Sequence, residues 1–132
     1  MGTLRPAFLT ATRGLVQDAV ICGHDSDAVT ALVWLAAEHA DRCDARGVPT
    51  PDLRAELEES LDRFAALGAG SSQRVERLRI LTDTPHLDQG EITDKGYLNQ
   101  RVVRERRGPD VALVTAGGND ERLIERPTRA NT

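Results

Sequence analysis

The sequence of 132 residues has no long apolar run, since no stretch approaches the roughly 20 apolar residues that cross a bilayer. Its first residues, Met1 to Pro6, lack the basic start and apolar segment of a signal peptide. We therefore expect a cytoplasmic protein with no membrane partner. A chain of this length suffices for one domain with a single core.

Aromatic side chains are also scarce, at 3% of the residues, and the formal net charge is −4. Neither property favours nucleic acid, which is attracted to basic surfaces and stacks its bases on aromatic rings. We therefore expect no nucleic-acid partner. The one basic cluster comprises Arg101, Arg104, Arg106 and Arg107, and we interpret it as a solvated end of a helix.

Cysteine and histidine are few. The two cysteines, Cys22 and Cys43, form neither a metal-ligand pattern nor a disulfide framework, so we expect free thiols and no metal site. The histidines His24, His39 and His86 are dispersed in polar stretches, and we assign none of them a catalytic role.

Helical spacing of apolar residues predicts three helices. One covers residues 4–13 and another runs from about Tyr97 to Arg107. The third begins at Thr50 and Pro51, which suit a helix start, and continues through apolar residues at helical spacing to Leu67.

Strands are predicted over residues 15–22 and about 76–80. Residues 28–37 fit either a helix face or a strand, and we prefer a strand paired with 15–22, because the intervening turn has hairpin length. The sum is a small α+β domain: a β-hairpin, one further strand, and helices packed on one face. We expect the domain to comprise residues 1–107, followed by a loosely held tail, 108–132.

Two glycines and a lysine mark the segment GEITDKGYLNQR, residues 90–101. Of the 17 basic residues, Lys95 is the only lysine. Gly90 and Gly96 permit sharp turns and a close approach of the backbone to a ligand. A lysine between them is a mobile point charge that can reach a phosphate or carboxylate. The spacing alone also fits a solvated loop lysine.

Together with GSSQRV (residues 70–75) and VVRERR (residues 102–107), this segment resembles the C-terminal domain of adenylate-forming acyl- and aryl-CoA ligases, feruloyl-CoA synthetase in particular. The stretches GTLR (residues 2–5) and VQDAVICGHD (residues 16–25) also resemble the start of that domain. The resemblance covers about residues 2–107, and GEITDKGY-x-NQR is its most specific motif.

The resemblance implies a small lid that works with a large N-terminal adenylation domain. The complete enzyme uses ATP, Mg²⁺ and coenzyme A, and activates an aromatic or fatty carboxylic acid as an acyl-adenylate. The lid then rotates for thioester formation, and its lysine serves only the adenylation half-reaction. For this chain the resemblance implies a catalytic role for Lys95 and cofactor contacts for Gly90, Thr93, Gly96 and Arg104.

The chain departs from this family in two places. Many relatives carry the lysine directly after the glycine, where this chain has Glu91, and the sequence after Arg107 differs from the usual ending. No phosphate-binding loop or dinucleotide motif occurs in the sequence, so we expect the isolated chain to bind no cofactor and to be inactive. The alternative interpretation is a non-catalytic, stand-alone interaction domain with the lid fold. A nucleotide- or RNA-binding module that uses the arginine cluster is a third.

Overall fold

The computed structural model describes residues 4–22, 29–67, 75–83, 87–93, 95, 98–116 and 120–125. In these ranges one sheet has the strand order β1-β2-β3-β4. Its strands are β1 (Val16–Cys22), β2 (Val29–Leu35), β3 (Val75–Ile80) and β4 (Leu123–Glu125). The β1–β2 and β3–β4 pairs are antiparallel and the β2–β3 pair is parallel, so the sheet is mixed.

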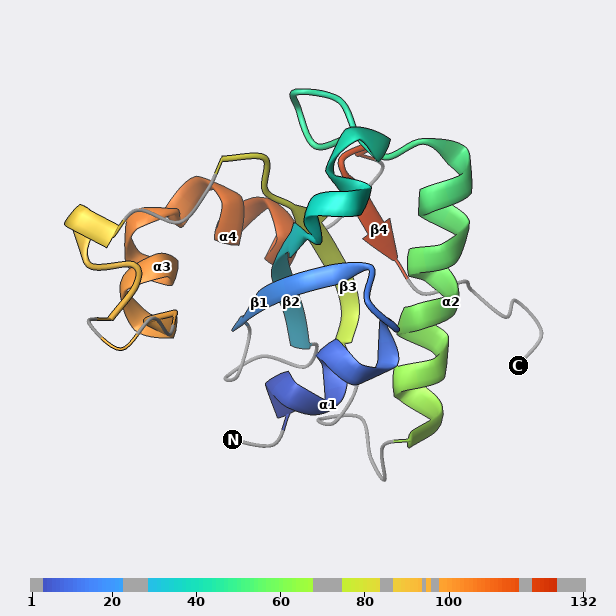
Figure 1. Ribbon diagram of the computed structural model, residues 1–132, viewed down its shortest axis with the longest axis horizontal. Helices are drawn as coiled ribbons and strands as arrows, with labels where there is room; N and C mark the ends of the chain where they lie inside the picture. The colour runs from blue at the N-terminus through green and yellow to red at the C-terminus, as the bar shows by residue number, and fades with distance from the viewer. Residues whose placement is uncertain are drawn as a thin grey trace.

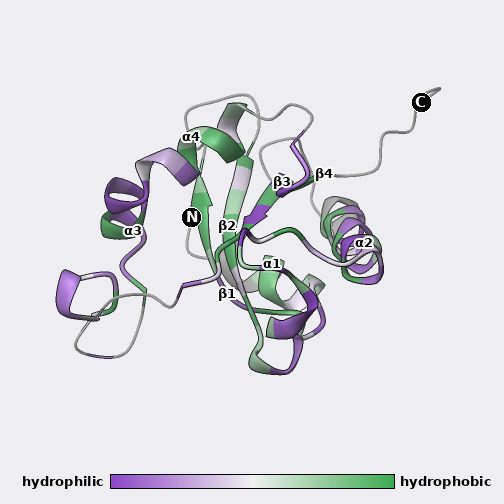
Figure 2. Ribbon diagram, turned by 90° about the horizontal axis from the view of Figure 1, so that it is seen from above, coloured by the Kyte–Doolittle hydropathy of each residue, from purple (hydrophilic) through white to green (hydrophobic). Residues whose placement is uncertain are grey.

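Helices lie on both sides of this sheet, as Figures 1 and 2 show. The helical elements in the described ranges are α1 (Leu4–Ala11), η1 (Ala37–Arg42), α2 (Pro51–Leu67), η3 (Leu87–Gln89), α3 (Gln100–Arg106) and α4 (Gly108–Ala116). Helices α1 and α2 cover one face, while α3 and α4 cover the other. The predicted α+β class is thus confirmed, and the expected packing of helices on one face is corrected to both faces.

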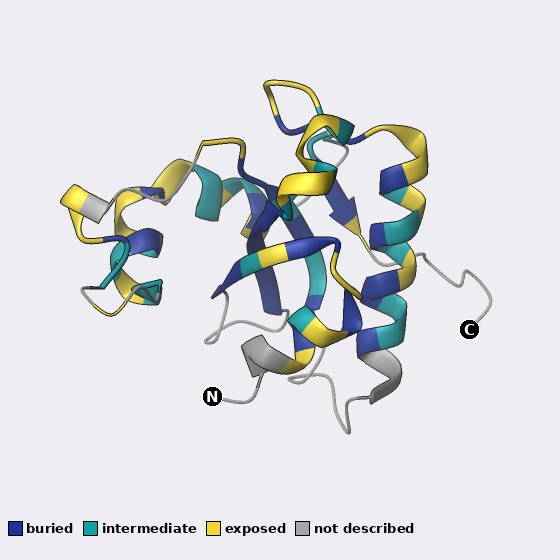
Figure 3. Cartoon of the chain, viewed as in Figure 1, coloured by how far each residue is buried: buried dark blue, intermediate teal, exposed yellow. Residues whose placement is uncertain are grey.

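The residues of β2 explain the second helical layer. All seven are buried, so neither face of this strand is wet (Figure 3). Ala31 and Val33 belong to the apolar cluster under α1 and α2, whereas Leu32 and Trp34 belong to the cluster under α3 and α4. A strand that is apolar on both faces needs cover on both, which a single layer of helices cannot give.

The predicted hairpin and long helix are both confirmed. Strand β1 pairs antiparallel with β2, with Ala19 opposite Val33. Helix α2 starts as expected, since the Thr50 hydroxyl accepts a hydrogen bond from the Leu53 backbone N–H at 3.2 Å. Its apolar face is fully buried at Leu53, Leu57 and Leu61.

The expectation of a loosely held tail after Arg107 is wrong for residues 108–116 and 123–125. These residues form α4 and β4, and Val114 and Ile124 are both completely buried. The Arg77 guanidinium of β3 donates to the Val114 carbonyl at 2.6 Å and so holds the end of α4. Such a contact joins residues far apart in the chain and leaves no local pattern in the sequence.

Two further expectations concern cysteine and membranes. Both cysteines are free thiols, as expected; Cys22 is buried, and that burial raises the pKa of its thiol to about 11. Even α2, the longest helix in the described ranges, is too short and too polar to span a membrane.

We predict that Leu57→Asp strongly destabilises the fold, because it places an unpaired charge in the apolar cluster under α2. The free energy of unfolding should fall by at least about 3 kcal/mol, measured by urea denaturation. The matched control is Ala55→Asp, an exposed position of the same helix, which should cost less than about 1 kcal/mol. Equal effects of the two variants would contradict burial of this face.

Candidate functional site

The sole lysine lies in a loop whose two ends are joined. The backbone N–H of Asn99 donates to the carbonyl of Glu91 at 2.7 Å, and Ile92 forms an antiparallel bridge with Leu98. Lys95 lies between these ends and is exposed. Figure 1 shows η3 and α3 beside this loop, at the end of the molecule remote from α2. The fold therefore presents Lys95 to solvent from an anchored segment.

Gly90 lies at the start of the loop with a φ of 85°, in the left-handed region that residues other than glycine rarely adopt. An added Cβ there would find Val102 Cγ1 at 3.8 Å, an ordinary contact. The backbone conformation, and not crowding, therefore requires glycine at this position.

Helix α3 follows the loop and is fixed at its first turn. The Asn99 side-chain oxygen accepts a hydrogen bond from the Val102 N–H at 3.2 Å and caps the helix. The Gln100 amide then pairs with the outer edge of β1: it accepts from the Ile21 N–H and donates to the Ala19 carbonyl, both at 3.0 Å. Gln100 thus satisfies two backbone groups that an edge strand leaves open.

Arg104 continues the same docking one turn later. Its guanidinium is half-buried and donates to the carbonyl of Ile21 at 3.2 Å. The predicted cofactor residue is therefore placed where it holds α3 against the edge of β1.

The other end of the loop is held by a buried ion pair. The carboxylate of Glu91 is completely buried and receives two hydrogen bonds from Arg107, at 2.9 Å from Nε and 3.1 Å from Nη2. Arg106 adds a third, at 3.2 Å. A carboxylate gripped by a guanidinium fork is fixed in plane as well as in distance.

Arg107 is itself fixed by the sheet. Its guanidinium lies 5.3 Å from the centroid of the Trp34 ring and donates to the Asp83 carboxylate at 2.8 Å. Burial favours a lower pKa for Arg107, but its hydrogen bonds to Asp83 and Glu91 outweigh this and hold that pKa above the ordinary value. The side chain therefore stays charged at every physiological pH.

The structure brings together three of the five predicted site residues on one loop. Gly90 and Lys95 are exposed and Thr93 is half-buried, while Arg104 lies on α3 and contacts β1. Gly96 lies outside the described residues. The catalytic and cofactor-binding roles of these residues stay predictions.

The side chains that anchor this loop were missed by sequence reasoning. In the sequence, Glu91 stands out only as a departure from the family pattern, and Arg107 only as a member of an arginine cluster. Their one signal in the sequence was their place at the two ends of the motif-bearing segment. Trp34 and Asp83 gave no signal.

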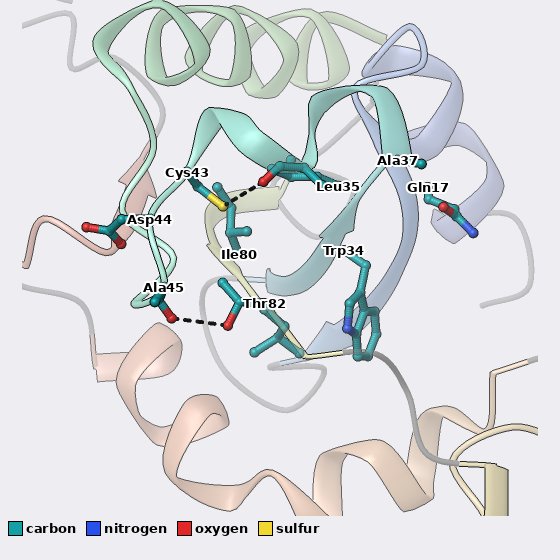
Figure 4. Close-up of a pocket in the computed structure, with 11 residues that line it drawn as sticks. Gln17, Trp34, Leu35, Ala37, Cys43, Asp44, Ala45, Ile80 and Thr82 are labelled. Carbon is teal, nitrogen blue, oxygen red and sulfur yellow. Dashed lines mark hydrogen bonds between the residues drawn. The ribbon is translucent and has the colours of Figure 1, made fainter.

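An apolar cavity of about 440 Å³ lies beside this network, at the ends of β2 and β3. Figure 4 shows Trp34 and Thr82 near its lower end and Cys43 above them. Asp44 supplies a carboxylate to its wall, and that group accepts hydrogen bonds from the backbone N–H of Arg46 and Val48. Asp44 is the one charged residue among those that line the cavity in the described ranges. The histidines, cysteines and acids of the described ranges do not gather in any group suited to a metal ion.

Comparison with known proteins gave matches to solved structures alone. No family model matches the sequence, and no curated protein does. The A-PCP didomain of carboxylic acid reductase from Segniliparus rugosus, in complex with AMP, matches with a TM-score of 0.66 and 22% identity over 87% of this chain. The A domain of the same reductase, with AMP and a co-purified carboxylic acid, matches with a TM-score of 0.65 and 20% identity over 86%.

This chain spans only 16% and 17% of those two solved chains. The likeness shows that a small part of an adenylate-forming enzyme shares the fold of this chain. At this level of identity the likeness shows the fold alone, so the chemistry has to be argued from the site.

We predict that Gln100→Met loosens α3 from the sheet. The substitution keeps the length of the side chain but leaves the Ile21 N–H and the Ala19 carbonyl without their partner. The free energy of unfolding should fall by about 1–3 kcal/mol in urea denaturation, and amide hydrogen exchange at Ile21 should accelerate. Arg101→Met is the control, since Arg101 is exposed and, among the described residues, forms its ion pair with Glu105 on its own helix. Equal stability of the two variants would contradict the docking role.

Proposed function

We propose that this chain is the C-terminal lid domain of an ATP-dependent acyl- or aryl-CoA ligase of the feruloyl-CoA synthetase kind. The observation that carries the proposal is an exposed lysine on a loop anchored at both ends, within the motif GEITDKGYLNQR. The likeness in fold to part of an adenylation domain supports the same class.

In this proposal Lys95 enters the active site of a large adenylation domain. Its ammonium lies between the substrate carboxylate and the α-phosphate of ATP and offsets their mutual repulsion as they approach. A fixed charge in a site closed to water stabilises a transition state more strongly than one in solvent. The exposed position of Lys95 suits this role, because a side chain that faces solvent can reach into a partner domain.

The large domain, covalently linked or separate, would hold what this chain does not. In this proposal the large domain binds Mg²⁺ together with the acid. The solved neighbours are complexes with AMP, and one holds a carboxylic acid, which agrees with ATP and an aromatic or fatty acid as substrates. Coenzyme A would take the acyl group in the second half-reaction, and we place the enzyme in the cytoplasm.

We predict that the isolated chain releases no pyrophosphate when it is given ATP, Mg²⁺ and a panel of hydroxycinnamic acids. The physical reason is that one exposed lysine cannot by itself bind and orient two substrates. The measurement is a coupled pyrophosphate assay. Turnover by this chain alone would contradict the lid interpretation.

The second prediction concerns the two half-reactions. Fused behind the large domain of a feruloyl-CoA synthetase, the chain should support adenylation, and Lys95→Ala should slow that step by roughly 10²–10³-fold. Thioester formation from pre-made feruloyl-adenylate should keep its rate, because the lid has then rotated Lys95 away. ATP–pyrophosphate exchange measures the first step, and loss of the coenzyme A thiol measures the second.

Lys95→Arg is the matched control, since it keeps the charge but changes its reach; it should lie between the parent and Lys95→Ala. Equal losses in both half-reactions would point to a docking defect. No loss in either would favour a non-catalytic interaction domain.

A further inference from the structure

We propose that Glu91 is the positioning residue for Lys95: its buried carboxylate, gripped by Arg107, sets where the loop presents the lysine. This inference rests on the proposed function. Glu91 does not itself contact substrate and acts only through the loop that it anchors.

Glu91 is fixed by both its backbone and its side chain. Its carbonyl accepts the Asn99 N–H, which closes the loop at its base. Its completely buried carboxylate is held by three hydrogen bonds from two arginines. The residue four positions before Lys95 therefore has little freedom to move.

The anchor of the loop is a charged pair. An apolar pair of similar size would often stabilise a core as well as a buried ion pair does. A guanidinium fork differs in that it fixes the direction of its partner as well as its distance. Bidentate pairing at the base of a lysine-bearing loop therefore serves orientation more than stability.

The anchor of the loop is continuous with the sheet. Arg107 is held by Trp34 of β2 and by Asp83, which follows β3. At the other end of the loop, Gln100 is bound to the edge of β1. Contacts from β1, from β2 and from the residue that follows β3 thus hold the two ends of the loop, and Lys95 between these ends is exposed.

The test is a double-mutant cycle in the fusion with the large domain. Glu91→Gln keeps the shape of the side chain and removes its charge, so Arg107 turns toward Asp83 and the loop loses its fixed orientation. A displacement of about 1 Å at a reacting group can cost 10²-fold in rate. We therefore expect adenylation to slow by about 10- to 100-fold, with an unchanged rate of thioester formation from pre-made adenylate.

In the Lys95→Ala background, Glu91→Gln should have no further effect on adenylation, because there is no lysine left to position. A residue with a merely structural role would slow both backgrounds equally. Glu105→Gln is the matched control: it removes one carboxylate from α3, but Glu105 is exposed and pairs only with Arg101 in the contacts described. This control should keep the parent rate in both half-reactions.

Amide hydrogen exchange of the 132-residue chain gives a readout that does not depend on activity. In Glu91→Gln the Asn99 amide should exchange at least about tenfold faster, while the Ile21 amide, bound to Gln100, keeps its rate. If Glu91→Gln fails to fold, Arg107→Lys replaces it; this variant keeps the positive charge but loses the fork, and the same two changes are expected of it.

The outcomes separate the two proposals. An unchanged rate of adenylation in Lys95→Ala would overturn the proposed function and the positioning role with it. A strong effect of Lys95→Ala beside unchanged adenylation in Glu91→Gln would overturn the positioning role alone. Equal slowing by Glu91→Gln in both backgrounds, or equal acceleration of exchange at Asn99 and Ile21, would reduce Glu91 to a structural residue.

Discussion

Burial of β2 on both of its faces is the constraint from which the rest of this structure follows. All seven of its residues are buried, so helices have to cover both sides of a small sheet. The face under α1 and α2 is closed by the long apolar stripe of α2. The other face is closed by two short helices, α3 and α4, and their docking places the lysine-bearing loop.

Short helices bury little apolar area, so polar contacts also help to hold α3 and α4 against the sheet. Arg79 of β3 pairs with Asp110 at the start of α4, while Arg77 reaches the carbonyl of Val114 near its end. Each charge is suitably placed, since a helix favours an acid near its first turn and a cation near its last. On α3, Gln100 likewise holds the helix against the sheet, through hydrogen bonds to the edge strand β1. Hydrogen bonds from arginine and amide side chains therefore help to hold the layer of α3 and α4, in addition to its buried apolar area.

The fold of this chain says less about its function than the lysine-bearing loop does. A small part of each of two solved chains, at 20–22% identity, shares the fold of this chain, yet a fold alone does not specify a reaction. The specific content lies in a loop of about ten residues: a glycine in a left-handed conformation, a buried acid, an exposed lysine and a helix cap. The glycine and the helix cap shape the backbone, the acid binds it to the core, and the lysine is exposed.

Local patterns in the sequence determined the parts that depend on near neighbours. The stripe of leucines predicted α2, the short turn favoured the hairpin of β1 and β2, and two glycines around Lys95 marked the candidate loop. Tertiary structure alone decided the parallel pairing of β2 with β3, the burial of α4 and β4, and the grip of Arg107 on Glu91. Those features depend on contacts between residues far apart in the chain, and such contacts leave no local pattern in the sequence. Periodicity in the sequence shows which face of one element is apolar. It does not show which distant charge lies close enough to pair with a buried one. That pairing is decided only when both helical layers pack against the sheet.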